Sequence, residues 1–143
     1  HFQTMQRKLA EFDQGFSALL EDLSSRGLLD TTIIWCCGEF GRTPRIEWDP
    51  PWNGGRGHWG NCFSAVVAGG GFKGGCVVGK SDSKAEYVVE RPVYPEDLLR
   101  SILILLGIDP DGQMPNDKGL DIKVMPYPEN YSGNGEIKEI MKK

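Results

Sequence analysis

The sequence lacks any uninterrupted apolar run of about 18 residues, the length that a helix needs to cross a bilayer. Its first residues also lack the basic, apolar and small-residue order of a secretion signal. We therefore expect no membrane-spanning segment. The chain begins at His1, directly before a long amphipathic pattern, so we interpret it as the C-terminal piece of something larger. The compartment stays open on this basis.

An excess of positive charge is also absent. Sixteen Lys and Arg residues against 20 Asp and Glu residues give a formal net charge of −4. A protein that binds a phosphate backbone normally concentrates basic residues on one face, whereas here they are scattered. Nucleic acid is therefore not expected as a partner. With 143 residues, 39% of them apolar, the chain is long enough for one globular domain with its own core.

Cysteines are few, and none of them forms a C-x-x-C pair of the kind that holds zinc or performs redox chemistry. The four are Cys36, Cys37, Cys62 and Cys76. Cys36 and Cys37 are adjacent, so in a strand their side chains point to opposite faces. We predict free cysteines that serve as small buried apolar residues.

Periodicity predicts a helix followed by two strands. Apolar residues recur three and four apart from Phe2 to Leu23, as in an amphipathic helix, and Gly27 is a natural residue to end it. Thr31 to Cys37 is apolar and β-branched without polar alternation, which predicts a strand covered on both faces in a parallel sheet. Cys62 to Ala68 predicts a second buried strand. Gly69 to Gly71 lacks the lysine and spacing of a P-loop, so we expect a turn there.

The rest of the chain has shorter signals. Cys76 to Gly79 and Tyr87 to Glu90 are typical of paired edge strands. A helix is predicted from Tyr94 to Leu106, with proline and carboxylates in its first turn. Residues 110–143 are expected to form an irregular C-terminal arm, ending from Glu136 in a last helical turn or two or in a frayed end. This order of elements favours an α/β fold, a three-layer α/β/α sandwich with an incomplete sheet.

Chemically useful side chains follow the first predicted strand. Glu39 lies just after Cys37, at the strand end where ligands gather in open α/β sheets. A carboxylate held there is suited to bind a metal or a substrate cation. Arg42 and Arg45 follow, and the arginine fork matches the oxygens of phosphate or sulfate. The alternative for Glu39 is an ion pair with Arg42 or Arg45.

A second group precedes the second predicted strand. It contains Arg56, His58 and Asn61, and His58 is one of only two histidines. Glu39 and His58 together offer an oxygen and a nitrogen ligand, the mixture used for zinc, manganese or iron. Two alternatives stay open: His58 only hydrogen-bonds a loop carbonyl, and Arg42 and Arg56 are structural arginines.

These residues lie in three segments that resemble the C-terminal half of domain of unknown function 1501. The segments are "LLEDLSSRGLLDTTIIWCCGEFGRTPRI", "GRGHWGNCFSAVVAGGGFKGG" and "RPVYPEDLLRSILILLGIDP". The family is related to the alkaline phosphatase and sulfatase superfamily. The resemblance implies an alkaline-phosphatase-like sandwich with divalent metals, zinc, manganese, calcium or magnesium, at the sheet edge. There the metals polarise a phosphate or sulfate ester for attack by a serine, threonine or modified cysteine.

The resemblance also implies roles for single residues. Glu39 resembles the strand-end aspartate ligand of the superfamily, and His58 resembles the later histidine ligand. Arg42, Arg56 and Asn61 would bind the substrate. The nucleophile and an Asp-x-His segment with further ligands would lie upstream of His1. The chain would then be the C-terminal part of one domain, inactive alone, from a periplasmic or secreted hydrolase of small-molecule or glycan esters.

Three departures favour other functions. Phe40 stands where the superfamily often has a ligand histidine, and Gly57 stands where the family usually has an aspartate. No nucleophile can be assigned to Cys36, Cys37, Thr43 or Ser64. One alternative is therefore a catalytically degenerate member that serves as a binding or scaffold domain. Another is a metal-free anion-binding domain built on Arg42, Arg45 and Arg56.

Overall fold

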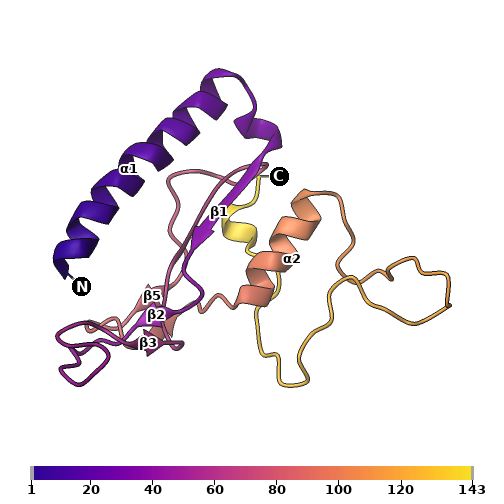
Figure 1. Cartoon of the computed structure of the whole chain (residues 1–143). Coiled ribbons are helices and arrows are strands. Elements are labelled where there is room, and N and C mark those ends of the chain that lie inside the picture. The colour runs from indigo at the N-terminus through magenta and orange to yellow at the C-terminus, as the bar shows by residue number, and fades with distance from the viewer. Residues whose placement is uncertain (1, 143) are drawn as a thin grey trace.

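The computed structural model describes residues 2–142, and within them the fold is mixed α/β, as the sequence predicts. Two α-helices accompany three small antiparallel sheets (Figure 1). In chain order the elements are α1 (Phe2–Ser25), the 3-10 turn η1 (Leu29–Thr31), β1 (Ile33–Cys37), β2 (Gly41–Arg42), β3 (His58–Trp59), β4 (Ala65–Gly69), β5 (Lys80–Ser81), β6 (Val88–Glu90), α2 (Pro95–Leu105) and the 3-10 turn η2 (Lys138–Ile140).

Helix α1 confirms the amphipathic pattern and its predicted stop. Gly27 has φ 69°. Its N–H donates to the Ser24 carbonyl at 3.0 Å, and the Leu28 N–H donates to the Leu23 carbonyl at 2.8 Å. This pair of bonds is the Schellman ending that glycine permits. No residue of α1 is buried, and the helix stands beside the rest of the molecule (Figure 1).

Strands β1 and β4 pair antiparallel, with Ile33 opposite Gly69 and Cys37 opposite Ala65. The predicted parallel sheet is therefore wrong. Parallel neighbours need a crossover connection, usually a helix, whereas the chain between these strands forms a hairpin. The predicted burial on both faces is also wrong, because Trp35 is 47% and Val66 53% exposed.

The glycine triplet forms the predicted turn. Gly69, Gly70 and Gly71 have φ values of 71°, 50° and 95°, a region that residues with a side chain rarely adopt. The Phe72 N–H closes the turn on the Gly69 carbonyl at 2.8 Å. A Cβ atom on Gly69 would overlap the Thr32 carbonyl oxygen. The triplet therefore lets the backbone pass close to the start of β1.

The paired edge strands form, but the first is displaced. β6 (Val88–Glu90) lies inside the predicted range and pairs with β5 (Lys80–Ser81). The prediction of a strand from Cys76 to Gly79 is wrong. Gly75 and Gly79 have φ values of 72° and 85°, which interrupt an extended backbone.

Helix α2 confirms the predicted helix to within one residue at each end, and it begins at Pro95. Tyr94 is the N-cap, and its N–H donates to the Asp97 carboxylate at 3.0 Å, as in a capping box. Asp97 is fully buried and also accepts a hydrogen bond from the Tyr131 hydroxyl. Burial, together with this bond, raises the pKa of Tyr131 to about 12. Asp97 thus both caps α2 and attaches the arm to it.

The core lies between the β1–β4 sheet, α2 and the end of the chain. Its buried members are Phe72, Leu98, Ile137 and Ile140. The Lys73 N–H donates to the Ile140 carbonyl at 2.7 Å. The C-terminal segment therefore has a single 3-10 turn and is packed into the core instead of frayed.

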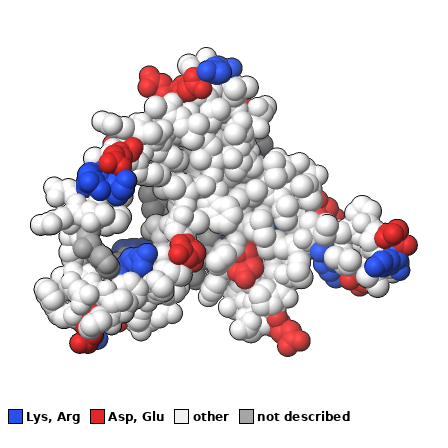
Figure 2. All heavy atoms as spheres, viewed as in Figure 1, with Lys and Arg blue, Asp and Glu red and all other residues white. Residues whose placement is uncertain are grey.

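Residues 110–135, the greater part of the predicted arm, contain no helix or strand. Arg100 on α2 holds it: its guanidinium donates to both carboxylate oxygens of Asp111 at 2.9 and 2.7 Å and to the Tyr127 hydroxyl at 2.6 Å. Arg91 likewise forms two bonds to Glu139, at 2.6 and 3.1 Å. On the face shown in Figure 2, positive and negative side chains are dispersed.

Acid is expected to weaken this attachment. Arg100 bonds to the ionised Asp111 and holds its pKa below the ordinary 3.8, and Arg91 holds the pKa of Glu139 below 4.5. A lowered pKa adds stability above the unfolded pKa, and that stability is lost as the pH falls through the lower folded value. We expect the urea midpoint to stay level from pH 7 to about 5 and to fall below about pH 4.5.

Tryptophan fluorescence during urea unfolding measures this midpoint. Glu139→Gln should lower it at neutral pH and make its fall in acid shallower. Glu129→Gln, at an exposed position of the arm, should behave as wild type. A midpoint that stays level down to about pH 3 would contradict the expectation.

Ser101 joins α2 to the C-terminal segment inside the core. Its hydroxyl donates to the Asp97 carbonyl at 2.7 Å and accepts the Ile137 N–H at 2.8 Å. Ser101→Ala leaves that buried N–H without a partner, and we expect a loss of about 1–3 kcal/mol in the free energy of unfolding. Urea titration measures it, with the exposed Ser83→Ala as control, expected within about 0.5 kcal/mol of wild type. Equal effects of both variants would refute the role of Ser101.

Candidate functional site

The sheet register brings the two predicted ligands to one end of the β1–β4 sheet. Because Cys37 lies opposite Ala65, the chain leaves β1 and enters β4 at the same end. Glu39 lies just after β1, and His58 lies in the segment that leads into β4. Both belong to the connection at that end.

Residues 41–59 form an antiparallel hairpin, which we call the site arm. Gly41 pairs with Trp59 and Arg42 with His58, and farther out Glu47 bridges to Gly55. Directly opposed residues of an antiparallel pair place their side chains on the same face. The side chains of Arg42 and His58 therefore lie beside each other on one face of the arm.

The imidazole of His58 lies in an aromatic cluster. Its centroid is 4.0 Å from the Phe40 ring at 38°, and 5.2 Å from the Trp52 ring at 66°. The Arg42 guanidinium carbon is 5.4 Å from the centre of the Phe40 ring, within the range of a cation–π contact. Phe40, where the resemblance implies a histidine, thus supports both the imidazole and the guanidinium.

Glu39 is exposed. Its carboxylate forms no ion pair or hydrogen bond with residues 2–142, so the pairing with Arg42 or Arg45 that the sequence left open is not formed. In the same part of the chain, the His58 ring donates no hydrogen bond to a loop carbonyl. Neither alternative explanation for these two side chains is therefore realised.

Arg56 has a structural role. It is half-buried, and its Nε donates to the Thr43 carbonyl at 2.5 Å while Nη2 donates to the Arg42 carbonyl at 3.3 Å. The alternative of a structural arginine is thus realised, with carbonyl acceptors in place of carboxylates. Asn61 lies exposed in the turn between β3 and β4. Of the three predicted substrate-binding residues, Arg42 is the one whose guanidinium lies exposed beside His58.

At this end of the β1–β4 sheet, the side chains that could donate to a metal are of suitable types but few in number. Glu39 supplies carboxylate oxygen and His58 supplies imidazole nitrogen. Within residues 2–142 no three His, Cys, Asp or Glu side chains are grouped to hold a metal ion. Catalytic zinc usually takes three protein ligands. A metal bound by Glu39 and His58 would need at least one further protein ligand.

The four cysteines are free, as predicted. Their predicted burial is wrong. Cys37 and Cys76 are exposed, and Cys36 and Cys62 are only half-buried. Cys37 is the last residue of β1, at the end of the sheet from which the site arm extends, and Cys76 follows the turn at Gly75.

A cleft of about 420 Å³ lies along the site arm, lined by residues 43–49, Trp59 and Glu86. The Trp59 indole N–H donates to the Glu86 carbonyl at 2.7 Å, which ties the arm to the loop before β6. A Cβ atom on Gly57 would lie 2.6 Å from a Glu47 carboxylate oxygen. Glu47 therefore occupies the space that an aspartate at position 57 would need.

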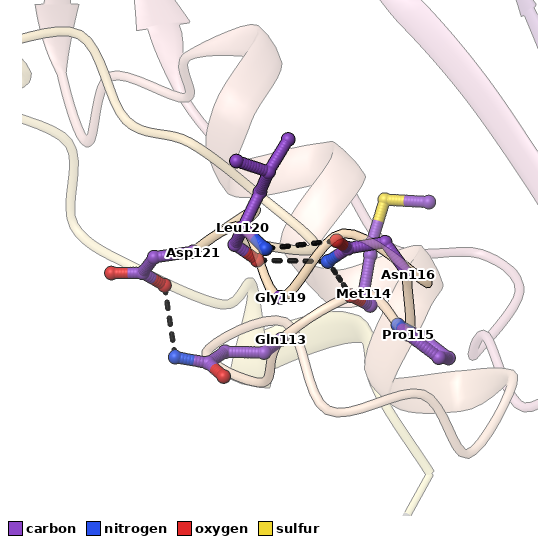
Figure 3. Close-up of a pocket in the computed structure, with 7 residues that line it drawn as sticks. All are labelled: Gln113, Met114, Pro115, Asn116, Gly119, Leu120 and Asp121. Atoms are coloured by element: carbon purple, nitrogen blue, oxygen red, sulfur yellow. Dashed lines mark hydrogen bonds between the residues drawn. The ribbon is translucent and has the colours of Figure 1, made fainter.

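A second cavity, of about 530 Å³, lies in the C-terminal arm (Figure 3). The Asn116 side chain closes the loop that forms it: its Oδ1 accepts the Leu120 N–H and its Nδ2 donates to the Leu120 carbonyl, both at 2.8 Å. Gln113 donates to Asp121 at 2.8 Å. Neither cavity has Glu39 or His58 in its lining.

Two residues of the site arm that support the site, Thr43 and Trp52, were not predicted from the sequence to do so. Thr43 binds Gly57 across the arm, and Trp52 packs on His58. The dipeptide Asn53-Gly54 was an available signal, because such a pair favours a tight hairpin turn. Both residues have positive φ, 44° and 87°.

Comparison with known proteins identifies the family. Residues 1–130 match the family model described as Protein of unknown function (DUF1501), so the chain belongs to this family. No curated protein and no solved structure matches the chain. Among residues 2–142, no helix has the length and apolar character to cross a membrane.

We expect Gly41 to be required for the pairing of β2 with β3 in the site arm. A Cβ atom there would overlap the Cys62 carbonyl oxygen and lie 2.9 Å from the Trp59 carbonyl oxygen. Both obstacles are backbone, so Gly41→Ala should separate β2 from β3 at a cost of about 1–3 kcal/mol. Near-ultraviolet circular dichroism reports the aromatic cluster, and urea titration the stability.

Gly60→Ala is the matched control, because a Cβ atom on Gly60 meets nothing within 4 Å. It should retain the wild-type aromatic signal. If Gly41→Ala gives the same spectrum and stability as Gly60→Ala, the close approach at Gly41 does not constrain the arm.

Proposed function

We propose that this chain is the C-terminal portion of a metal-dependent hydrolase of sulfate or phosphate esters, built on a three-layer α/β/α sandwich of the alkaline phosphatase type. Two observations support the layer order. In Figure 1, α1 and α2 lie on opposite sides of β1. Ile33 and Val67 of the β1–β4 sheet pack against the same core cluster that contains Leu98 of α2.

The main support for the activity is the position of Glu39 and His58 at one end of the sheet, with Arg42 directly opposite His58. In this proposal Glu39 and His58 are two of the metal ligands, and Arg42 binds the ester oxygens through its planar fork. Arg56 holds the Arg42 backbone in place. A bound divalent ion, zinc, manganese, calcium or magnesium, would polarise the ester. We assign no nucleophile to the described residues.

A second function is favoured by one specific contact. Phe40 packs on His58 at 4.0 Å between ring centroids, where a further ligand would be needed. A family member that has lost catalysis and binds anions through Arg42 and Arg45 fits this arrangement. Metal analysis after dialysis separates the two functions: a hydrolase retains about one metal ion per site, whereas an anion-binding domain keeps its sulfate affinity in the presence of a chelator.

Glu39→Ala is expected to remove metal and activity together. In the natural full-length protein, we expect the variant to lose about 100-fold or more in hydrolysis of an aryl sulfate or aryl phosphate, because a carboxylate ligand is lost. Glu129→Ala, in the distant arm, should retain both metal content and turnover. A wild-type protein without metal-dependent turnover, or unchanged activity of Glu39→Ala, would refute the hydrolase proposal.

A further inference from the structure

The register of the site arm decides which face carries His58. Strands β2 and β3 are only two residues long each. The segment that supplies β3 is rich in glycine, with Gly54, Gly55, Gly57 and Gly60. Register is weakly specified in glycine-rich strands, and a slip by one residue moves every side chain to the other face. Such a slip would carry His58 away from Arg42 and Phe40.

Thr43 makes contacts that oppose this slip. Its backbone N–H donates to the Gly57 carbonyl at 3.0 Å, and its hydroxyl oxygen accepts the Gly57 N–H at 2.9 Å. The hydroxyl itself donates to the Arg45 carbonyl at 2.9 Å. Thr43 thus binds both polar backbone groups of Gly57, the residue directly before His58.

The backbone of Thr43 also accepts a hydrogen bond from Arg56. Its carbonyl accepts the Arg56 Nε at 2.5 Å. Gly57 is buried and Thr43 is half-buried, so water cannot readily replace the bond between them. An unsatisfied buried N–H would cost more than an exposed one. The Thr43 hydroxyl and the Arg56 guanidinium are thus side-chain groups that bond across the site arm in this register.

We propose that Thr43 is a positioning residue that sets β2 against β3 and thereby keeps His58 beside Arg42 and on the Phe40 ring. The bearing of this inference on catalysis rests on the proposed function, but the positioning itself does not. Thr43 contacts neither predicted ligand and acts through Gly57. Its effect is therefore separable from the chemistry of Glu39 and His58.

Two substitutions at this position test the role. Thr43→Val keeps the shape of the side chain and removes the hydroxyl, whereas Thr43→Ser keeps the hydroxyl. The readouts are the proton chemical shifts of the His58 ring, which the Phe40 and Trp52 rings displace, and the hydrogen-exchange protection of the Gly57 amide. Thr43→Val should lose the ring-induced displacement and about tenfold of the protection, which corresponds to one lost buried hydrogen bond worth about 1.4 kcal/mol.

Thr43→Ser should retain both signals, and so should Thr31→Val, an exposed threonine in η1. The core contains no residue of the site arm, so the amides of Lys73 and Lys142 serve as internal checks that every variant is folded. Unchanged His58 shifts and unchanged Gly57 protection in Thr43→Val would overturn the inference.

Activity of the full-length protein separates this inference from the proposed function. If Thr43→Val alters the His58 signals while the wild type shows no metal-dependent turnover, the positioning role stands and the hydrolase proposal fails. If turnover is present and falls in Thr43→Val with the His58 signals unchanged, the positioning role fails and the hydrolase proposal stands.

Discussion

The antiparallel pairing of β1 with β4 is the constraint on which the candidate site depends. Its register places Cys37 opposite Ala65, so the connection between the strands must leave and return at one end of the sheet. Ile33 and Val67 pack on the core from the same pair of strands, which fixes the base of the site arm. Hydrogen bonds within the site arm, such as those of Thr43 with Arg56 and Gly57, then hold its side chains in position.

The C-terminal segment completes the core by packing Ile137 and Ile140 against Phe72 and Leu98. Each buried isoleucine there, Ile137 and Ile140, stabilises the fold by about 1.5–3 kcal/mol. The ion pair of Arg91 with Glu139 is partly exposed, with the two side chains 25% and 47% accessible, and such a pair contributes about 0–1 kcal/mol. Apolar burial therefore contributes more here than this ion pair, which joins Glu139 to Arg91 before the start of α2.

Local features could be predicted from the sequence, and features set by distant contacts could not. The periodic apolar residues and Gly27 gave the bounds of α1, and Pro95 marked the start of α2. An apolar run such as 31–37 is compatible with parallel or antiparallel neighbours, so the sense of the sheet was not determined by it. At the site, residue types indicated a metal or anion site near Glu39 and His58. Their contacts depend on the site arm, and the dipeptide Asn53-Gly54 is the sequence signal for its turn.

Helix α1 has a different relation to the rest of the molecule. It contributes none of the buried core residues, and its main contact within the described chain is with η1. In proteins most helical stability comes from packing an apolar face against the rest of the fold, and α1, with 24 residues and none of them buried, has little of this packing. We therefore expect its amides to open and exchange independently of the sheet and α2. A partner that covers its apolar face would stabilise the helix, and the cost of ordering the helix would weaken the observed binding.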